Sequence, residues 1–236
     1  MYDLGPEFGN ASVDPGTNLL VSGPPLSGVR RLSLEALAHG GRTDDAVLVI
    51  TTRYSAQQVL ADLETLVDTD NLVLGVVDCV TRRQNRAYED DRRVKYVTSP
   101  AALTRIGIKF SEFIKELRVR DIERTRVVLD SLSTMLPYAN TESAFKFVHV
   151  LAGQIDDADA LGLHTLRTGG TRRGTTAYSG GTVRRTCNCH GNAWTRSTSK
   201  SRGWPRAEYQ RSFLHPGGRT PRSPGRSSVV RADRSA

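Results

Sequence analysis

The sequence lacks several features that would place the protein in a simple class. No uninterrupted apolar run approaches the roughly 20 residues that a membrane-spanning helix needs. The first segment is polar and includes Asp3 and Glu7, which argues against a secretory signal peptide. Only three cysteines occur among 236 residues, too few for a disulfide framework. We therefore expect a cytoplasmic protein that has no membrane partner.

The C-terminal part of the chain lacks isoleucine and has a single lysine. Residues 163–236 hold 15 Lys and Arg but only 2 Asp and Glu, whereas residues 1–162 hold 18 and 23, so the overall charge of +8 hides a sharp break. With only seven Leu, Val and Phe residues, this basic segment cannot bury enough apolar surface to offset its ordering entropy. The composition predicts a folded domain over residues 1–165 and a disordered basic tail over 166–236.

Three interpretations of this tail remain open, besides that of a native disordered segment. Cys187-Asn-Cys189-His190 lacks the second ligand pair of a structural zinc site, so we expect no metal there. Arginines interspersed with Trp194, Trp204 and Tyr209 are typical of nucleic-acid-binding tails, although nucleic acid is the less favoured partner. The third interpretation is translation out of frame, because off-frame codons of a GC-rich gene yield Arg, Gly, Pro, Ser and Thr and little Lys or Ile.

The N-terminal segment contains an apolar run followed by two glycines and a helical pattern. Leu19–Val21 is typical of a short buried strand, Gly23 and Gly28 bound a loop, and residues 31–38 have the apolar spacing of a helix face. In this arrangement, backbone N–H groups of the loop and of the first helical turn can converge on an anion. The pattern therefore predicts a phosphate-binding loop.

The rest of the first 165 residues alternates between apolar runs and amphipathic patterns. The runs predict strands over residues 46–52, 71–79, 94–98, 126–134 and 160–166, and the patterns predict helices over 56–67 (capped by Ser55), 100–118 and 141–155. Strands without polar alternation, separated by helices, indicate a mostly parallel sheet with helices on both faces. We expect an α/β fold of the P-loop type.

Two positions of the expected phosphate loop hold residues that differ from those of a Walker A loop. The spacing G-x-x-x-x-G matches a Walker A loop, but Val29 stands where the lysine belongs and Arg30 where the Mg²⁺-binding Ser or Thr belongs. Arg30 or Arg31 could supply a cation, although a guanidinium fork differs from a lysine point charge. The candidate nucleotide-binding residues are Gly23, Pro24, Pro25, Leu26, Ser27, Gly28, Val29 and Arg30.

Asp130 is the candidate metal ligand. It ends an apolar strand, as a Walker B carboxylate does, and ligands of open α/β sheets bind at this end of the strands. Its expected role there is to hold Mg²⁺. The alternative is that Asp130 caps the following turn together with Ser131 or Ser133.

Three stretches together resemble a known family: 15–28, 47–52 and 127–134. They resemble RecA-superfamily ATPases of the KaiC-like type, and are most similar to short haloarchaeal signal-transduction ATPases, also called HTR-like proteins. The resemblance covers residues 1–165. It implies a P-loop NTPase fold with ATP and Mg²⁺ as cofactors, and it leaves open a homo-oligomer and a protein partner.

The sequence also departs from this family where hydrolysis would be supported. KaiC-like ATPases place glutamates after the second core strand to activate water, and the matching positions here are Thr52 and Arg53. Phosphoryl transfer depends on positioned cations and an oriented nucleophile. We therefore predict no catalytic residue and a regulatory pseudo-ATPase. The alternative is an interaction module that binds no nucleotide and engages a partner through its charged loop, residues 82–93.

Overall fold

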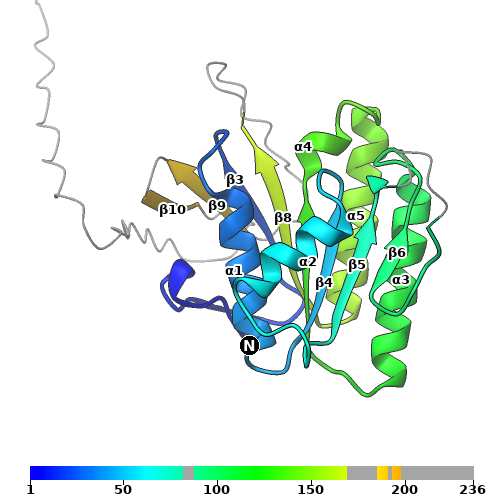
Figure 1. The fold of residues 1–236 in the computed structure, drawn as a ribbon. Helices are drawn as coiled ribbons and strands as arrows, with labels where there is room; N and C mark the ends of the chain where they lie inside the picture. The colour runs from blue at the N-terminus through cyan, green and yellow to red at the C-terminus, as the bar shows by residue number, and fades with distance from the viewer. Residues whose placement is uncertain (82–87, 169–184, 191–192, 198–236) are drawn as a thin grey trace, which may run out of the picture.

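The chain is organised around one eight-stranded sheet (Figure 1). The computed structural model describes residues 1–81, 88–168, 185–190 and 193–197. The strand order is β10-β9-β3-β8-β7-β4-β5-β6, and every neighbouring pair is parallel except β9 and β10. The strands are β3 (Asn18–Gly23), β4 (Ala46–Thr51), β5 (Leu74–Asp78), β6 (Val94–Tyr96), β7 (Thr125–Asp130), β8 (Leu161–Arg167), β9 (Arg185–His190) and β10 (Ala193–Ser197).

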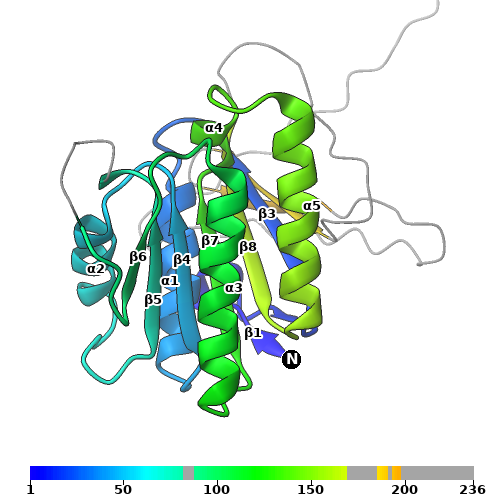
Figure 2. The ribbon, with the colours of Figure 1, turned by 90° about the vertical axis from the view of Figure 1, so that its right-hand side faces the viewer.

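Helices cover both faces of this sheet (Figures 1 and 2). Helices α1 (Val29–Gly41) and α2 (Ala56–Glu64) pack on one face, against a core cluster that includes Val47 and Val49. Helices α3 (Leu103–Val119) and α5 (Thr141–Asp157) cover the other face, whose cluster includes Leu48 and Ile50. Because successive strand residues point to opposite faces, both sides of β4 are apolar. The predicted α/β fold with a mostly parallel sheet is confirmed.

The helix boundaries follow the local chemistry of the sequence. Helix α2 begins after Ser55, whose hydroxyl accepts a hydrogen bond from the Gln58 N–H at 3.3 Å, as the sequence predicts. Asn140 caps α5 in the same way, with its side-chain oxygen 2.7 Å from the Ser143 nitrogen. In the described part of the chain, no helix is both long enough and apolar enough to cross a membrane.

The N-terminal segment forms a short hairpin that the sequence analysis does not predict. Strands β1 (Tyr2–Asp3) and β2 (Ser12–Val13) pair antiparallel around a short 3₁₀ helix, η1 (Pro6–Phe8). The buried Tyr2 hydroxyl donates to the Asp159 carbonyl at 3.0 Å and accepts from the Thr125 N–H at 3.1 Å. This hairpin closes the face of the sheet that carries α1. A four-residue helix, α4 (Leu132–Met135), follows β7 and is also absent from the sequence prediction.

Two segments of the tail, for which the composition predicts disorder, form strands in the structure. Strand β9 pairs parallel with β3, with Leu19 opposite Arg185, and β10 extends the sheet beyond β9. The ladder uses backbone N–H and C=O groups of the β3 edge, so it does not require the apolar side chains that the composition lacks. The aromatic residue Tyr209, the rest of the tail and the side chains of the Cys187–His190 cluster lie outside the described structure, as do residues 82–87 of the charged loop.

A buried ion pair joins the amino-terminal ends of the central strands. The fully buried Asp45 lies 2.6 Å from the Nε atom of Arg126 and 2.6 Å from that of Arg124. Arg126 also donates to the carbonyls of Asp3 at 2.7 Å and Ala36 at 2.9 Å. A Cβ atom on Gly40 would lie 2.0 Å from the Arg126 Nε atom, so glycine is required there. This network ties β4 and β7 to α1 and the N-terminal hairpin.

A second buried polar contact lies beneath α5. The Nε2 atom of His164 in β8 is 2.9 Å from the Oδ1 atom of Asn18 in β3. The Asn18 amide donates to the carbonyls of Gly16 and Ala152, both at 3.2 Å. Burial lowers the pKa of His164 to about 4, so the imidazole is neutral at physiological pH. This contact has the character of a structural link between β3, β8 and α5.

Candidate functional site

The candidate site lies at the carboxyl edge of the sheet, where β3 leads into α1. The Ser27 N–H donates to the Pro24 carbonyl at 3.2 Å, and the Gly28 carbonyl accepts from the Leu32 N–H at 2.9 Å. Gly28 has a φ of 79°, a left-handed conformation that glycine adopts without strain. Helix α1 then begins at Val29, so its first N–H groups face the loop. Local structure thus retains the strand–loop–helix arrangement of a phosphate loop.

Arg30 occupies the centre of this edge. Its Nε atom lies 3.0 Å from Oδ2 of Asp130, and its Nη1 atom lies 2.5 Å from Oδ2 of Asp62. The guanidinium carbon is 4.2 Å from the centroid of the Tyr54 ring, a distance typical of a cation–π contact. A single side chain from α1 therefore binds both α2 and the end of β7. Its Nη2 atom has no hydrogen-bond partner among the residues that the structure describes.

Arg31, the other candidate cation, takes no part in the site. Its Nε atom pairs with Oε1 of Glu35 at 2.8 Å on the surface of α1, and 78% of its side chain is exposed. Arg30, by contrast, is only 24% exposed. The helical rotation of about 100° per residue separates the two side chains. Of the two arginines, Arg30 is the one that the fold directs inward.

Asp130 is buried at the end of β7 and is already engaged by the protein. Oδ2 accepts from Arg30, and Oδ1 accepts from the Thr165 hydroxyl at 3.2 Å. Burial raises the pKa of Asp130, while the Arg30 guanidinium and the Thr165 hydroxyl act in the opposite direction. Asp130 does not cap the following turn, because the structure gives it no bond to Ser131 or Ser133.

This arrangement does not fit a divalent metal. A Mg²⁺ ion needs free oxygen ligands, and the position that would supply the loop hydroxyl carries a guanidinium bonded to Asp130. In the described part of the chain, no cluster of three or more His, Cys, Asp or Glu side chains could hold a metal ion. The role of Asp130 as a Mg²⁺ ligand remains a prediction that this geometry disfavours.

The positions of the family's glutamates are used for structure. The Thr52 hydroxyl accepts from the Ser131 N–H at 2.8 Å and donates to the Ser131 carbonyl at 2.9 Å, with the Thr134 hydroxyl 3.0 Å away. The Arg53 guanidinium lies 5.1 Å from the Tyr54 ring centroid. The hydrogen bonds of Thr52 join the ends of β4 and β7. Neither side chain is a carboxylate, so neither can take a proton from water as the family's base does.

The structure brings the predicted residues to one edge and adds three that the sequence analysis missed. The loop residues 23–30 and Asp130 lie at the same end of the parallel strands, and Tyr54, Asp62 and Thr165 complete their contacts. Asp62 had a sequence signal, because it shares the α2 face of Val59 and Leu63 and so places a charge beside the core. The other two had none.

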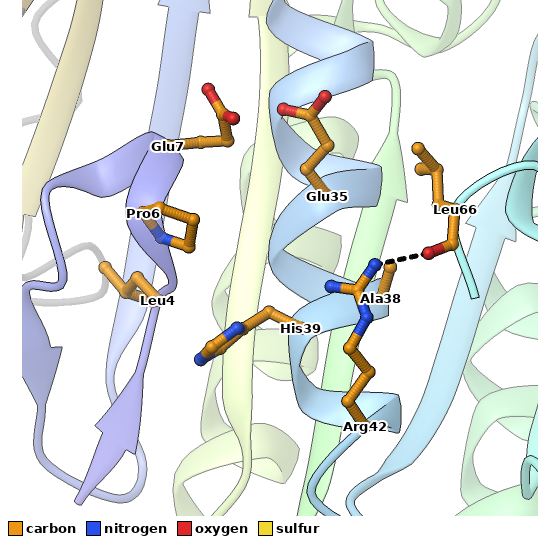
Figure 3. Close-up of a pocket in the computed structure, with 8 residues that line it drawn as sticks. All are labelled: Leu4, Pro6, Glu7, Glu35, Ala38, His39, Arg42 and Leu66. Carbon is orange, nitrogen blue, oxygen red and sulfur yellow. Dashed lines mark hydrogen bonds between the residues drawn. The ribbon is translucent and has the colours of Figure 1, made fainter.

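A separate cavity of about 250 Å³ lies beside the C-terminal half of α1 (Figure 3). Its lining residues are Leu4, Pro6, Glu7, Glu35, Ala38, His39, Arg42 and Leu66. Figure 3 shows η1 facing α1 across this space, with Arg42 hydrogen-bonded to the Leu66 carbonyl. The lining mixes two acids with two basic side chains and includes none of the predicted site residues. The cavity therefore defines no ligand class.

The arrangement of strands and helices matches a KaiC-like fold. Among solved structures, the chain is similar to a KaiC-like protein from the hyperthermophilic archaeon Pyrococcus horikoshii OT3, with a TM-score of 0.53 and 11% identity over 78% of this chain and 79% of that chain. A Pyrococcus horikoshii protein described as uncharacterized, in complex with an unknown peptide, matches with a TM-score of 0.58 and 14% identity over 78% and 83%. At these identities the likeness shows the fold alone.

The particular family follows from the sequence match. The family described as "Family of unknown function (DUF7504)" matches residues 16–176, and the chain belongs to it. No curated protein matches the chain. The matched range contains every residue of the candidate edge, from Gly23 to Thr165.

Proposed function

We propose that this protein binds the phosphates of a nucleotide, ATP in the first instance, at residues 23–30 and does not hydrolyse it. The proposal includes a regulatory role of the signal-transduction (HTR-like, haloarchaeal) type, in the cytoplasm. The observation that carries it is the Arg30–Asp130 pair at 3.0 Å. In this pair, the Asp130 carboxylate that would hold Mg²⁺ is already bonded to Arg30. The loop and the N-terminus of α1 still have a backbone arrangement that suits an anion.

The absence of hydrolysis follows from the side chains at the edge. Val29 is apolar and buried, so it supplies no charge to the β and γ phosphates. Thr52 and Arg53 replace the family's base, and Thr52 is bonded within the protein. Phosphoryl transfer draws its rate from positioned cations and an oriented water. Without these groups, binding can persist while turnover is lost.

The first prediction concerns nucleotide binding and turnover by the full-length protein. ATP at about 100 times its Kd should stabilise the folded state by about 2.7 kcal/mol and raise the melting temperature by several degrees. Val29→Lys should enlarge this shift, because it restores a cation beside the loop. Phosphate release should stay at background in both proteins. ATP turnover that is lost in Asp130→Asn would contradict the proposal.

A second candidate function, that of an interaction module, has its own support. The Pyrococcus horikoshii protein described as uncharacterized was solved in complex with an unknown peptide. In this chain, helix α5 exposes the apolar side chains of Phe145 and Val150. The described part of the charged loop, residues 88–93, is attached to helix α3, because the Asp90 carboxylate lies 2.9 Å from the Lys109 ammonium group. If ATP shifts the melting temperature of neither the wild-type protein nor Val29→Lys, the interaction module becomes the favoured function.

A further inference from the structure

At the carboxyl edge of the sheet, the positive charge is supplied by a side chain of the protein itself. Arg30 occupies the loop position whose side chain would bind Mg²⁺ in a Walker A loop. It also contacts Asp130, the carboxylate that would be the second ligand of that ion. The same guanidinium contacts Asp62 of α2 at 2.5 Å. Two acidic groups from separate elements thus converge on one arginine, which is the electrostatic role of a divalent ion in such a site.

We propose that Arg30 replaces the divalent metal, so that the site excludes Mg²⁺ and binds its phosphate ligand in metal-free form. The second half of this inference rests on the proposed nucleotide binding, whereas the first half does not. The guanidinium neutralises Asp130 without the octahedral oxygen shell that Mg²⁺ demands. Its Nη2 atom is buried and has no hydrogen-bond partner in the described part of the chain, so the guanidinium contributes its positive charge to the edge.

The geometry also explains why a metal cannot share the site with Arg30. A divalent ion bound to Asp130 would lie next to the guanidinium, and like charges at about 4 Å repel by several kcal/mol at the effective dielectric of a protein surface. Arg53 adds a further positive field at Asp130. Metal binding therefore requires that Arg30 leave, which would also break its contacts with Asp62 and Tyr54.

Exchange of Arg30 for threonine should reverse this preference. Arg30→Thr removes the internal cation and supplies the hydroxyl of a Walker A loop, leaving Asp130 and Asp62 as oxygen ligands for a hard cation. Arg31→Thr is the matched control, because it removes the same charge from the neighbouring position, where the side chain pairs with Glu35 on the surface. Arg30→Lys is a second variant that keeps a cation at the edge.

The test is a Mn²⁺ titration of the full-length chain followed by electron paramagnetic resonance, without nucleotide. We expect no saturable site in the wild-type protein, Arg31→Thr or Arg30→Lys, and one site in Arg30→Thr that weakens at least about tenfold when Asp130→Asn is added. Circular dichroism verifies that each variant is folded. A saturable site in the wild-type protein that Asp130→Asn removes would overturn the proposal, and so would a folded Arg30→Thr protein without one.

A nucleotide titration separates this inference from the proposed function. If ATP binds, its affinity should be the same in EDTA and in excess Mg²⁺, within about twofold. A loss of tenfold or more in EDTA would overturn the metal-free binding mode. If ATP binds in neither condition, the proposed function fails, while the Mn²⁺ titration still decides whether Arg30 excludes a metal. That titration also covers the case in which Arg30→Thr does not fold, since the wild-type protein and Asp130→Asn suffice.

Discussion

Replacement of Asp45 by asparagine is expected to lower the free energy of unfolding by about 3–5 kcal/mol. Asp45 is fully buried and neutralises the equally buried Arg126, whose Nε atom lies 2.6 Å away. The substitution keeps the shape of the side chain but leaves a guanidinium in the core without a counter-charge. Its remaining bonds to the carbonyls of Asp3 and Ala36 cannot supply that charge. Urea unfolding followed by circular dichroism measures the change.

The control for this prediction is the adjacent residue. Asp44→Asn removes the same charge from an exposed position and should change stability by no more than about 0.5 kcal/mol. Asparagine also tolerates the positive φ of 61° at position 44. Adding Arg126→Met to Asp45→Asn should recover much of the loss, because it removes the uncompensated charge. Equal effects of Asp44→Asn and Asp45→Asn would show that the buried pair is not what stabilises this end of the sheet.

Arg30→Met is expected to cost about 2–3 kcal/mol at neutral pH, somewhat less than a fully buried pair because a quarter of the Arg30 side chain is exposed. The substitution leaves Asp130 buried without its main counter-charge. Asp62 is less affected, since it lies nearer to solvent. The surface variant Arg31→Met should cost no more than about 0.5 kcal/mol, as expected for an exposed i,i+4 pair.

The cost of Arg30→Met should depend on pH in a defined direction. Burial raises the pKa of Asp130, so the folded state holds the proton in a pH range where the unfolded state has lost it. Stability therefore falls as pH rises through this range. Arg30 lowers the pKa of Asp130, so its loss raises the upper end of the pH range over which stability falls. The deficit of Arg30→Met should be small near pH 4 and largest at neutral pH, and Asp130→Asn should abolish this dependence. A deficit that is constant with pH would contradict the assigned pairing.

The order of strands and helices in the first 165 residues was predictable because the hydrophobic pattern is strong. Runs such as 46–50 and 127–129 are apolar without alternation, as is typical of strands in a parallel sheet that helices cover on both faces. The tail strands β9 and β10 were not predictable from composition, because they are held by backbone pairing along the β3 edge. Arg126 could not be recognised as buried either, since its counter-ion Asp45 is distant in sequence and next to the exposed Asp44.

The candidate edge was predictable in its backbone but not in its side-chain contacts. Glycine spacing and the strand–helix pattern located residues 23–30, and the end of an apolar strand located Asp130. The sequence left Arg30 and Arg31 as equal candidates for the cation. Only the rotation of α1 relative to β7 and α2 decides between them, and that rotation depends on the packing of the whole helix.

A crystal structure of the full-length protein, grown with a non-hydrolysable ATP analogue and Mg²⁺, tests the central claim most directly. The account predicts phosphate density over the loop 23–28, the Arg30 guanidinium still within hydrogen-bond distance of Asp130, and no metal between them. A Mg²⁺ ion coordinated by Asp130, with Arg30 displaced from the edge, would contradict it.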